Sequence, residues 1–249
     1  MKNPLRFALF LLAWPALAAE PPTPPARSPE AMEILKKADA AIKAVDAVRY
    51  QVSIVPSGVA TNFVSAAEGS AVLIGWDGRS QPKKFYAQVK TKRPGKDETV
   101  EITGGGDGES YFVVDHGTKK GYEDMDPAVL GSTGRALQAV MVIEFVHDKP
   151  FDDELGADKV ELVGVEDIAG ETCDRIHVVY AGGQGASTWF FSKRDSLPRR
   201  RIREIDSPAR GKGAIEITLK AIEVAPQVDA ALFKMKLPAG YQRVDDFAP

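Results

Sequence analysis

Short runs in which apolar and polar residues alternate recur along most of this chain, and each run ends at a turn sequence. Alternation with period two is typical of β-strands that bury one face. Turns as short as Asp77-Gly78 or His116-Gly117 join antiparallel neighbours, because parallel strands need long crossover connections. We predict ten strands: 49–55, 70–76, 84–90, 99–103 and 110–115 in a first set, and 159–166, 171–180, 187–193, 199–206 and 213–224 in a second.

Two segments show helical spacing instead. Ser28-Pro29-Glu30 has the N-cap, the first-turn proline and the first-turn acid of a helix start, and apolar spacing carries that helix to about Ala47. The segment Arg135–Val146 is apolar and helical in period, and it separates the two sets of strands. The predicted fold is α+β and mainly β. One strongly curved antiparallel sheet of about ten strands forms an unclosed β-barrel, with the N-terminal helix and the central helical segment as its lid.

The N-terminus has the features of a secretory signal peptide. Lys2 and Arg6 precede the apolar run Phe7–Trp14, and Ala16-Leu17-Ala18 provides an A-x-A cleavage site. The apolar run is shorter than the ~20 residues of a membrane-spanning helix. We predict residues 1–18 as the signal peptide and a soluble periplasmic product without a transmembrane segment.

Prolines are dense just after the predicted cleavage site. Residues 19–29 are therefore predicted as an extended spacer, and residues 30–249 as a single domain. The net charge of −3 and 27% charged residues describe an ordinary surface, so we expect no nucleic acid as partner. Cys173 is the only cysteine, which excludes an internal disulfide.

Three motifs suggest chemistry but have simpler explanations. Cys173 and His177 share a strand face but lie ~13 Å apart at ~3.3 Å per residue, too far for a nucleophile pair. The glycine run 104–108 joins two strands and lacks a P-loop lysine, so we predict a flexible hairpin turn. The acidic run Asp152-Asp153-Glu154 lacks the spacing of a calcium loop and is expected to be solvated. We predict no enzyme activity, no metal and no cofactor.

Several local sequences resemble a known group of proteins. Gly170, Cys173, Ile176 and Val178 form one motif, and Trp189 with Leu197-Pro198-Arg199-Arg200 forms the next. Together with the ending "DAALFKMKLPAGYQRVDD" from Asp229, they are similar to an uncharacterised family within the periplasmic lipoprotein-carrier (LolA/LolB-like) superfamily. The resemblance covers about residues 32–246. It implies an unclosed barrel with a helical lid and an apolar ligand, but no named substrate.

Aromatic side chains are spread over nearly every predicted strand, which is consistent either with plain core or with a lined cavity. In the second interpretation the apolar cavity is lined by Tyr50, Trp76, Phe85, Phe112, Leu137, Met141, Phe145, Trp189 and Phe191. Alternation also places Arg199, Arg201 and Arg203 on one face of the following strand, as a cationic rim for an acidic head group.

The leading functional hypothesis is a non-enzymatic periplasmic carrier that shields a lipid, an acyl chain or a lipidated protein, with residues 137–145 as the lid. An envelope sensor that recognises a lipoprotein or another protein signal is the alternative. A hydrolase is a third class, which needs a clustered nucleophile and base. The ligand, the direction of transfer and the oligomeric state are open at this point.

Overall fold

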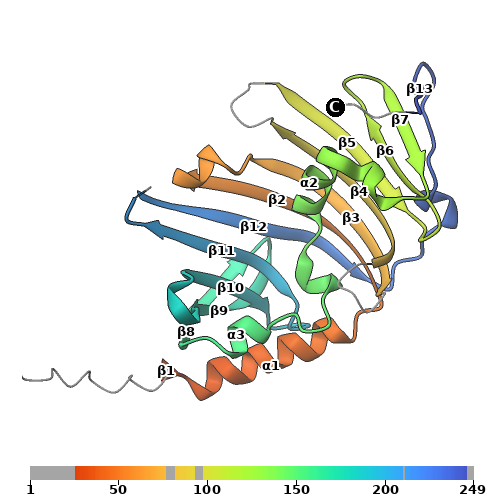
Figure 1. Ribbon diagram of the computed structural model, residues 1–249. Helices are drawn as coiled ribbons and strands as arrows, with labels where there is room; N and C mark the ends of the chain where they lie inside the picture. The colour runs from red at the N-terminus through yellow and green to blue at the C-terminus, as the bar shows by residue number, and fades with distance from the viewer. Residues whose placement is uncertain (1–25, 77–81, 93–97, 210, 246–249) are drawn as a thin grey trace, which may run out of the picture.

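A computed structural model describes residues 26–76, 82–92, 98–209 and 211–245. These residues form one strongly curved, unclosed sheet of thirteen strands (Figure 1). Its strand order is β1-β8-β9-β10-β11-β12-β2-β3-β4-β5-β6-β7-β13. The strands are β1 (Ala26–Arg27), β2 (Ala47–Gly58), β3 (Ala67–Trp76), β4 (Pro82–Lys92), β5 (Thr99–Gly106), β6 (Tyr111–Asp115), β7 (Lys120–Asp124), β8 (Lys159–Ile168), β9 (Glu171–Val179), β10 (Ala186–Ser192), β11 (Pro198–Ser207), β12 (Gly211–Val224) and β13 (Gln242–Arg243).

The sheet consists of two antiparallel meanders, β2–β7 and β8–β12, which join where β12 pairs antiparallel with β2. All ten predicted strands are present, and the predicted unclosed, curved sheet is confirmed. Three strands were missed. The segment Lys120–Asp124 has too little alternation to be recognised, and β1 and β13 have two residues each. These two pair parallel with β8 and β7, so the sheet is mixed at its edges.

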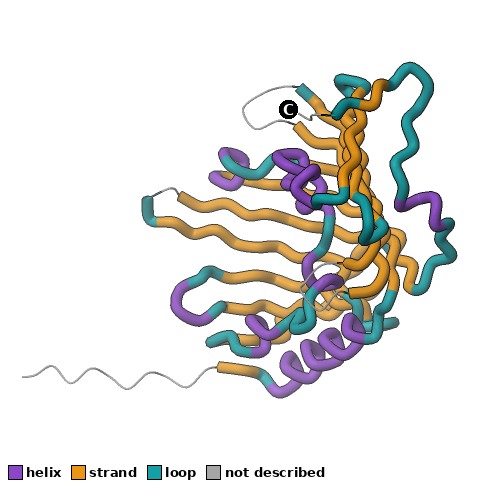
Figure 2. The backbone as a smooth tube through the Cα atoms, turned by 45° about the vertical axis from the view of Figure 1, so that its right-hand side comes forward, coloured by secondary structure: helices purple, strands orange, loops and turns teal. Residues whose placement is uncertain are grey.

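Helical segments cover the concave face of the sheet (Figures 1 and 2). They are α1 (Pro29–Lys43), α2 (Gly131–Val140), α3 (Asp152–Leu155) and the 3-10 turn η3 (Ile143–Val146); further 3-10 turns are η1 (Val59–Asn62), η2 (Pro127–Leu130), η4 (Ala181–Gly183) and η5 (Ala230–Phe233). α1 begins as predicted, with the Ser28 side chain accepting a hydrogen bond from the Ala31 N–H at 3.1 Å. It ends at Lys43 because Ala47 already belongs to β2.

The central helix is broken, which corrects the prediction of one helical segment over 135–146. α2 ends at Val140, and Met141 is extended, with φ −89° and ψ 108°. The buried Tyr50 hydroxyl occupies the break: it accepts a hydrogen bond from the Val142 N–H at 2.8 Å and donates one to the Val140 carbonyl at 3.1 Å. A side chain of β2 thus takes over hydrogen bonds that a continuous helix would make itself.

The glycine run at 104–108 is also different from the prediction. Gly104 to Gly106 continue β5, and only the following residues turn, where the Asp107 carboxylate accepts the N–H groups of Glu109 and Ser110. A side chain at Gly104 would overlap Leu137 of α2. The missing side chain therefore lets α2 lie directly on the sheet.

Candidate functional site

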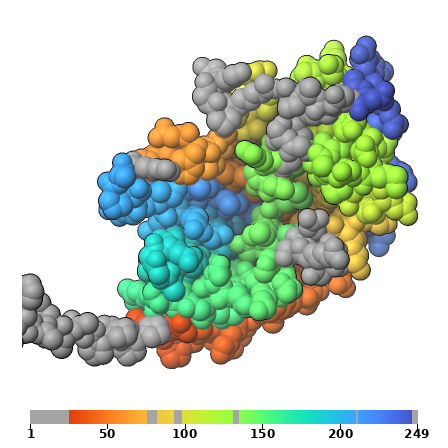
Figure 3. Space-filling model, in the orientation of Figure 1, coloured from red at the N-terminus to blue at the C-terminus, as the bar shows by residue number. Residues whose placement is uncertain are grey.

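A pocket of about 250 Å³ opens on the concave side between the segment α2–η3 and strands β10–β12. In the space-filling view the green atoms of α2–η3 lie across this side beside the blue atoms of β11 and β12 (Figure 3). We call it the inner pocket. It is lined by Gln138, Ala139, Met141, Val142, Ile143, Glu144, Trp189, Pro198, Arg200, Arg201, Ile217 and Leu219.

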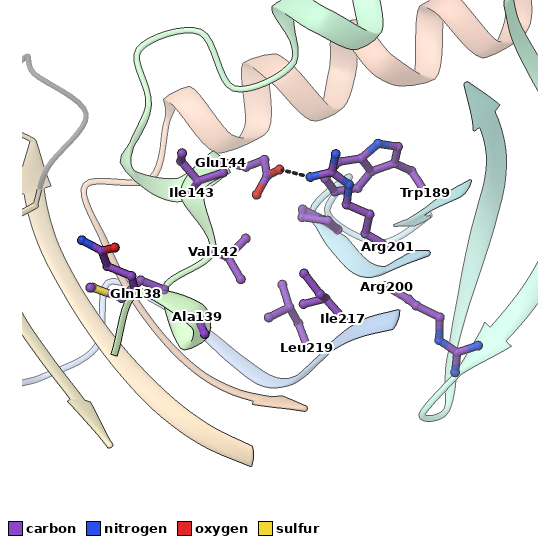
Figure 4. Close-up of a pocket in the computed structure, with 12 residues that line it drawn as sticks. Gln138, Ala139, Val142, Ile143, Glu144, Trp189, Arg200, Arg201, Ile217 and Leu219 are labelled. Carbon is purple, nitrogen blue, oxygen red and sulfur yellow. Dashed lines mark hydrogen bonds and ion pairs between the residues drawn. The ribbon is translucent and has the colours of Figure 1, made fainter. Parts of the chain in front are cut away.

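Most of the inner pocket wall is apolar. Ile217 and Leu219 alternate along β12 and point toward Val142, which stands opposite them just after the break in α2 (Figure 4). Ile143 is 57% exposed at the edge of the pocket. Such a wall can shield an apolar group from water, and it offers no hydrogen-bonding partner to that group.

One wall of the pocket carries a charged pair. Arg201 Nη1 lies 3.1 Å from Glu144 Oε1, and the guanidinium lies 4.6 Å from the centre of the Trp189 ring (Figure 4). Trp189 and Arg201 face each other across β10 and β11, so strand register brings the ring and the cation together. Glu144 is buried, and its burial raises the pKa of the carboxyl group, while Arg201 opposes this effect.

Behind Trp189 the polar network continues into the core. The Tyr180 hydroxyl donates to Glu154 Oε1 at 2.6 Å, and Trp189 Nε1 donates to the same oxygen at 3.2 Å. Arg201 Nη2 donates to the Tyr180 hydroxyl at 3.2 Å. The expectation that Glu154 is solvated was therefore wrong, because its side chain is only 4% exposed. The Tyr180 hydroxyl and the Trp189 indole N–H provide the hydrogen bonds that a buried carboxylate needs.

The structure brings only part of the predicted cavity lining together. Met141 and Trp189 line the inner pocket. Tyr50, Phe85, Leu137, Phe145 and Phe191 belong instead to the packed core of the concave side. Phe112 lies on the outer face of the sheet, where its ring covers Gly105. Trp76 ends β3, and its side chain lies outside the described residues.

The three predicted rim arginines have three different environments. A β-bulge breaks the register between β10 and β11, since Phe190 pairs with Arg200 but Phe191 pairs with Pro198. Arg199 is consequently buried and binds Glu171 and Asp195 at 2.7 and 2.6 Å. Arg203 is exposed, with its guanidinium 5.7 Å from the Tyr180 ring centre. Of these three arginines only Arg201 lines the inner pocket, beside Arg200, so the predicted three-arginine rim does not exist as one surface.

The remaining chemical candidates have structural roles. Cys173 is buried in a small cluster on the outer face with Phe190, and burial raises the pKa of its thiol to about 11. His177 Nδ1 faces Thr188 Oγ1 at 3.3 Å, not the thiol. Within the described residues, no three His, Cys, Asp or Glu side chains gather as metal ligands would.

Sequence reasoning missed several residues of the inner pocket. The alternation of β12 identifies Ile217 and Leu219 as one apolar face, with Glu216 and Thr218 on the other. The predicted lining was drawn from aromatic residues and the central helical segment, so these aliphatic residues were not included. Val142 and Glu144 were assigned to a continuous helix, and no local signal marks the break that Tyr50 stabilises from β2.

No protein-family model matches the sequence, and neither does any curated protein. Among solved structures, LprF from Mycobacterium bovis matches at 16% identity over 88% of this chain and 100% of LprF, with a TM-score of 0.50. The lipoprotein LppX from Mycobacterium tuberculosis matches at 12% identity over 81% of this chain and 100% of LppX, with a TM-score of 0.47. A LolA superfamily protein from Nitrosomonas europaea matches at 10% identity over 82% of this chain and 97% of that chain, with a TM-score of 0.32.

Identities this low show a likeness of fold alone. At that level the expected fold is confirmed, because the curved, unclosed sheet of this chain is similar to the fold of LprF. In the described part of the chain, no helix has the length and apolar character needed to cross a membrane.

Proposed function

We propose that this protein is a non-enzymatic carrier or binding protein that shields an apolar group, such as an acyl chain, in the inner pocket. The observation that supports it most is the pocket itself, because Met141, Val142, Ile217 and Leu219 form an apolar wall beside an open sheet. A lipid or a lipidated protein is the proposed partner. The polar groups at the pocket already bind one another, which suits binding better than catalysis.

The size of the inner pocket suggests that its cover moves. At about 250 Å³ it is smaller than the ~300–1,000 Å³ of typical ligand sites, so as it stands it accepts only part of a lipid. The segment α2–η3 forms its cover, and the extended Met141 interrupts that cover. We place the hinge of a lid at this interruption, with the Tyr50 hydroxyl holding the closed state.

Arg201 is the proposed contact for an acidic head group. It is the one predicted rim arginine at the inner pocket, and it is partly exposed there. In the described structure its partner is Glu144, a carboxylate for which a ligand carboxylate can substitute. Release of Glu144 would then accompany the binding of an anionic lipid.

Export completes the proposal. The charged, apolar and A-x-A segments within residues 1–18 support a signal peptide and a periplasmic location, and residues 19–29 are the proposed spacer before the domain. Two of these spacer residues, Ala26 and Arg27, form β1, and the Arg27 Nε donates to the Ala157 carbonyl at 2.7 Å.

Titration with dansyl-undecanoic acid tests the proposal, together with mass spectrometry of lipids that co-purify. Ile217→Trp fills the inner pocket and takes the space of the ligand, so we expect affinity for the dye to fall about tenfold, which corresponds to about 1.4 kcal/mol of binding free energy. Val55→Trp is the control, because it adds the same ring at a residue that is 54% exposed. Its affinity should stay within about twofold of the wild type.

Two results would contradict the proposal. One is the absence of both co-purifying lipid and a saturable fluorescence change. The other is an equal loss of affinity in the two tryptophan variants, which would place the dye outside the inner pocket.

A further inference from the structure

A second pocket lies on the outer face of the sheet, between β4–β6 and the segment 229–238. Its volume is about 420 Å³, which falls within the ~300–1,000 Å³ of typical ligand sites. Figure 2 shows this C-terminal segment on the opposite side of the sheet from α2. We call it the outer pocket, and it shares no lining residue with the inner pocket.

The floor of the outer pocket follows from strand register. Gln88, Thr103 and Val114 stand in one row across β4, β5 and β6, and Tyr86 and Phe112 stand in the next row. Gly105 lies between the last two, and a side chain there would meet the Phe112 ring at 2.7 Å. The glycine therefore lets the ring lie over β5 as a flat apolar floor.

The wall of the outer pocket comes from alternation in the C-terminal segment. Met235 and Leu237 pack against Gly121 of β7. Lys234 precedes Met235, and Lys236 lies between Met235 and Leu237. Both lysines line the outer pocket. The same extended backbone thus fixes the segment to the sheet and directs two ammonium groups toward the site.

The charges at the outer pocket leave one cation available. Lys234 Nζ lies 3.2 Å from Asp107 Oδ2, so its charge is already paired. Asp229 caps η5 by accepting the Ala231 N–H at 2.9 Å. Lys236 is exposed, and among the described residues no hydrogen bond or ion pair engages it.

A polar network fixes the edge of the floor. His116 Nε2 lies 2.8 Å from Thr103 Oγ1, and His116 Nδ1 lies 3.0 Å from the Tyr241 hydroxyl. The Tyr241 ring also meets the imidazole edge-on at 5.6 Å between centroids. His116 therefore connects the floor strand β5 to the chain just beyond the segment 229–238, which forms the wall of the pocket.

We infer that the outer pocket binds a small organic anion with a flat apolar body. Phe112, Val114 and Leu232 contact the apolar body, and the Lys236 ammonium pairs with its carboxylate, sulfonate or phosphate. This second site does not depend on the function proposed for the inner pocket.

Two dyes that differ mainly by one anionic group test the inference. The first is 8-anilinonaphthalene-1-sulfonate, and the second is the neutral N-phenyl-1-naphthylamine. Lys236→Met should weaken the sulfonate dye about two- to fivefold and leave the neutral dye nearly unchanged, because only one dye loses an exposed ion pair. Leu232→Trp should weaken both dyes by filling the pocket.

Lys220→Met is the matched control for Lys236→Met, because Lys220 is an exposed lysine of β12 that lines neither pocket.

Amide chemical shifts of the full chain locate the dye. We expect the sulfonate dye to shift Val114, Thr103 and Lys236. Shifts confined to Ile217 and Leu219 would overturn the inference, since they would place the dye in the inner pocket. An absence of binding, or equal weakening of both dyes by Lys236→Met, would also overturn it. Thermal unfolding of each variant verifies that the chain remains folded. If Leu232→Trp does not fold, Lys236→Met still tests the inference, because it changes an exposed side chain.

Discussion

The two ends of the concave face are covered in different ways. Over β8–β10 the cover is solid: the Phe151 ring lies 5.3 Å from Trp189 and 5.4 Å from Phe191, and Trp189 stacks on Phe191 at 5.8 Å. Over β3–β5 the cover is α2, which is interrupted at Met141 and leaves the inner pocket beside it. The β8–β10 end thus provides stability, whereas the broken cover over β3–β5 leaves a space between itself and β10–β12.

Phe151 gives the largest expected effect and tests the solid end. Phe151→Ala removes a fully buried ring that packs on two others, so we expect a loss of ~3–5 kcal/mol in the free energy of unfolding, measured in urea. Ile217→Ala, at the pocket wall, should cost ~2 kcal/mol or less, because its side chain already borders empty space. Equal losses would mean that the two ends are packed alike.

Tyr50 tests the interrupted end. Tyr50→Phe leaves the buried Val142 N–H without its acceptor, so we expect a loss of ~1–3 kcal/mol and faster hydrogen exchange at Val142. Tyr111→Phe is the control, a half-buried tyrosine whose ring packs near Phe85 and whose hydroxyl makes no hydrogen bond within the described residues. Unchanged exchange at Val142 in Tyr50→Phe would show that the hydroxyl does not hold the lid.

Glu144 gives the smallest expected effect, a dependence of stability on pH. Burial raises the pKa of Glu144 in the folded protein, so the folded state binds this proton more tightly than the unfolded state. The stability that this tighter proton binding contributes is fully present below the usual carboxyl pKa of 4.5, and it is lost as pH rises through the raised pKa of the folded protein. Relative to Glu144→Gln, the wild type should therefore lose stability with rising pH. Urea unfolding from about pH 4 to about pH 8 measures this, and a constant difference would contradict it.

The strands and the N-terminal helix could be predicted because their signals are local. Alternation, turn residues and the Ser28 cap each act within a few residues. The same rule correctly sent Trp189 and Phe191 to one face and Phe190 to the other. The curved, unclosed sheet could thus be anticipated in outline.

The errors come from contacts between distant segments. The α2 break depends on Tyr50, ninety positions earlier in the chain, as the Tyr50–Val140 separation shows. Arg199 left the predicted rim because of a bulge that places it between Glu171 and Asp195. Burial would raise the pKa of Glu171, but hydrogen bonds from Arg199 and Ser192 outweigh burial and lower it, as expected for a structural ion pair. Neither the break in α2 nor the burial of Arg199 can be predicted from the residues next to it in the sequence.

The join between β12 and β2 has a kinetic consequence. Each meander pairs strands that are neighbours in sequence, so each can form through short loop closures. The join pairs Val48 with Val224 and Ile54 with Ile217, so it closes a loop that contains most of the chain. We therefore expect two fast-forming halves and a slow final docking step. During synthesis, a chain that does not yet include Val224 cannot complete its sheet.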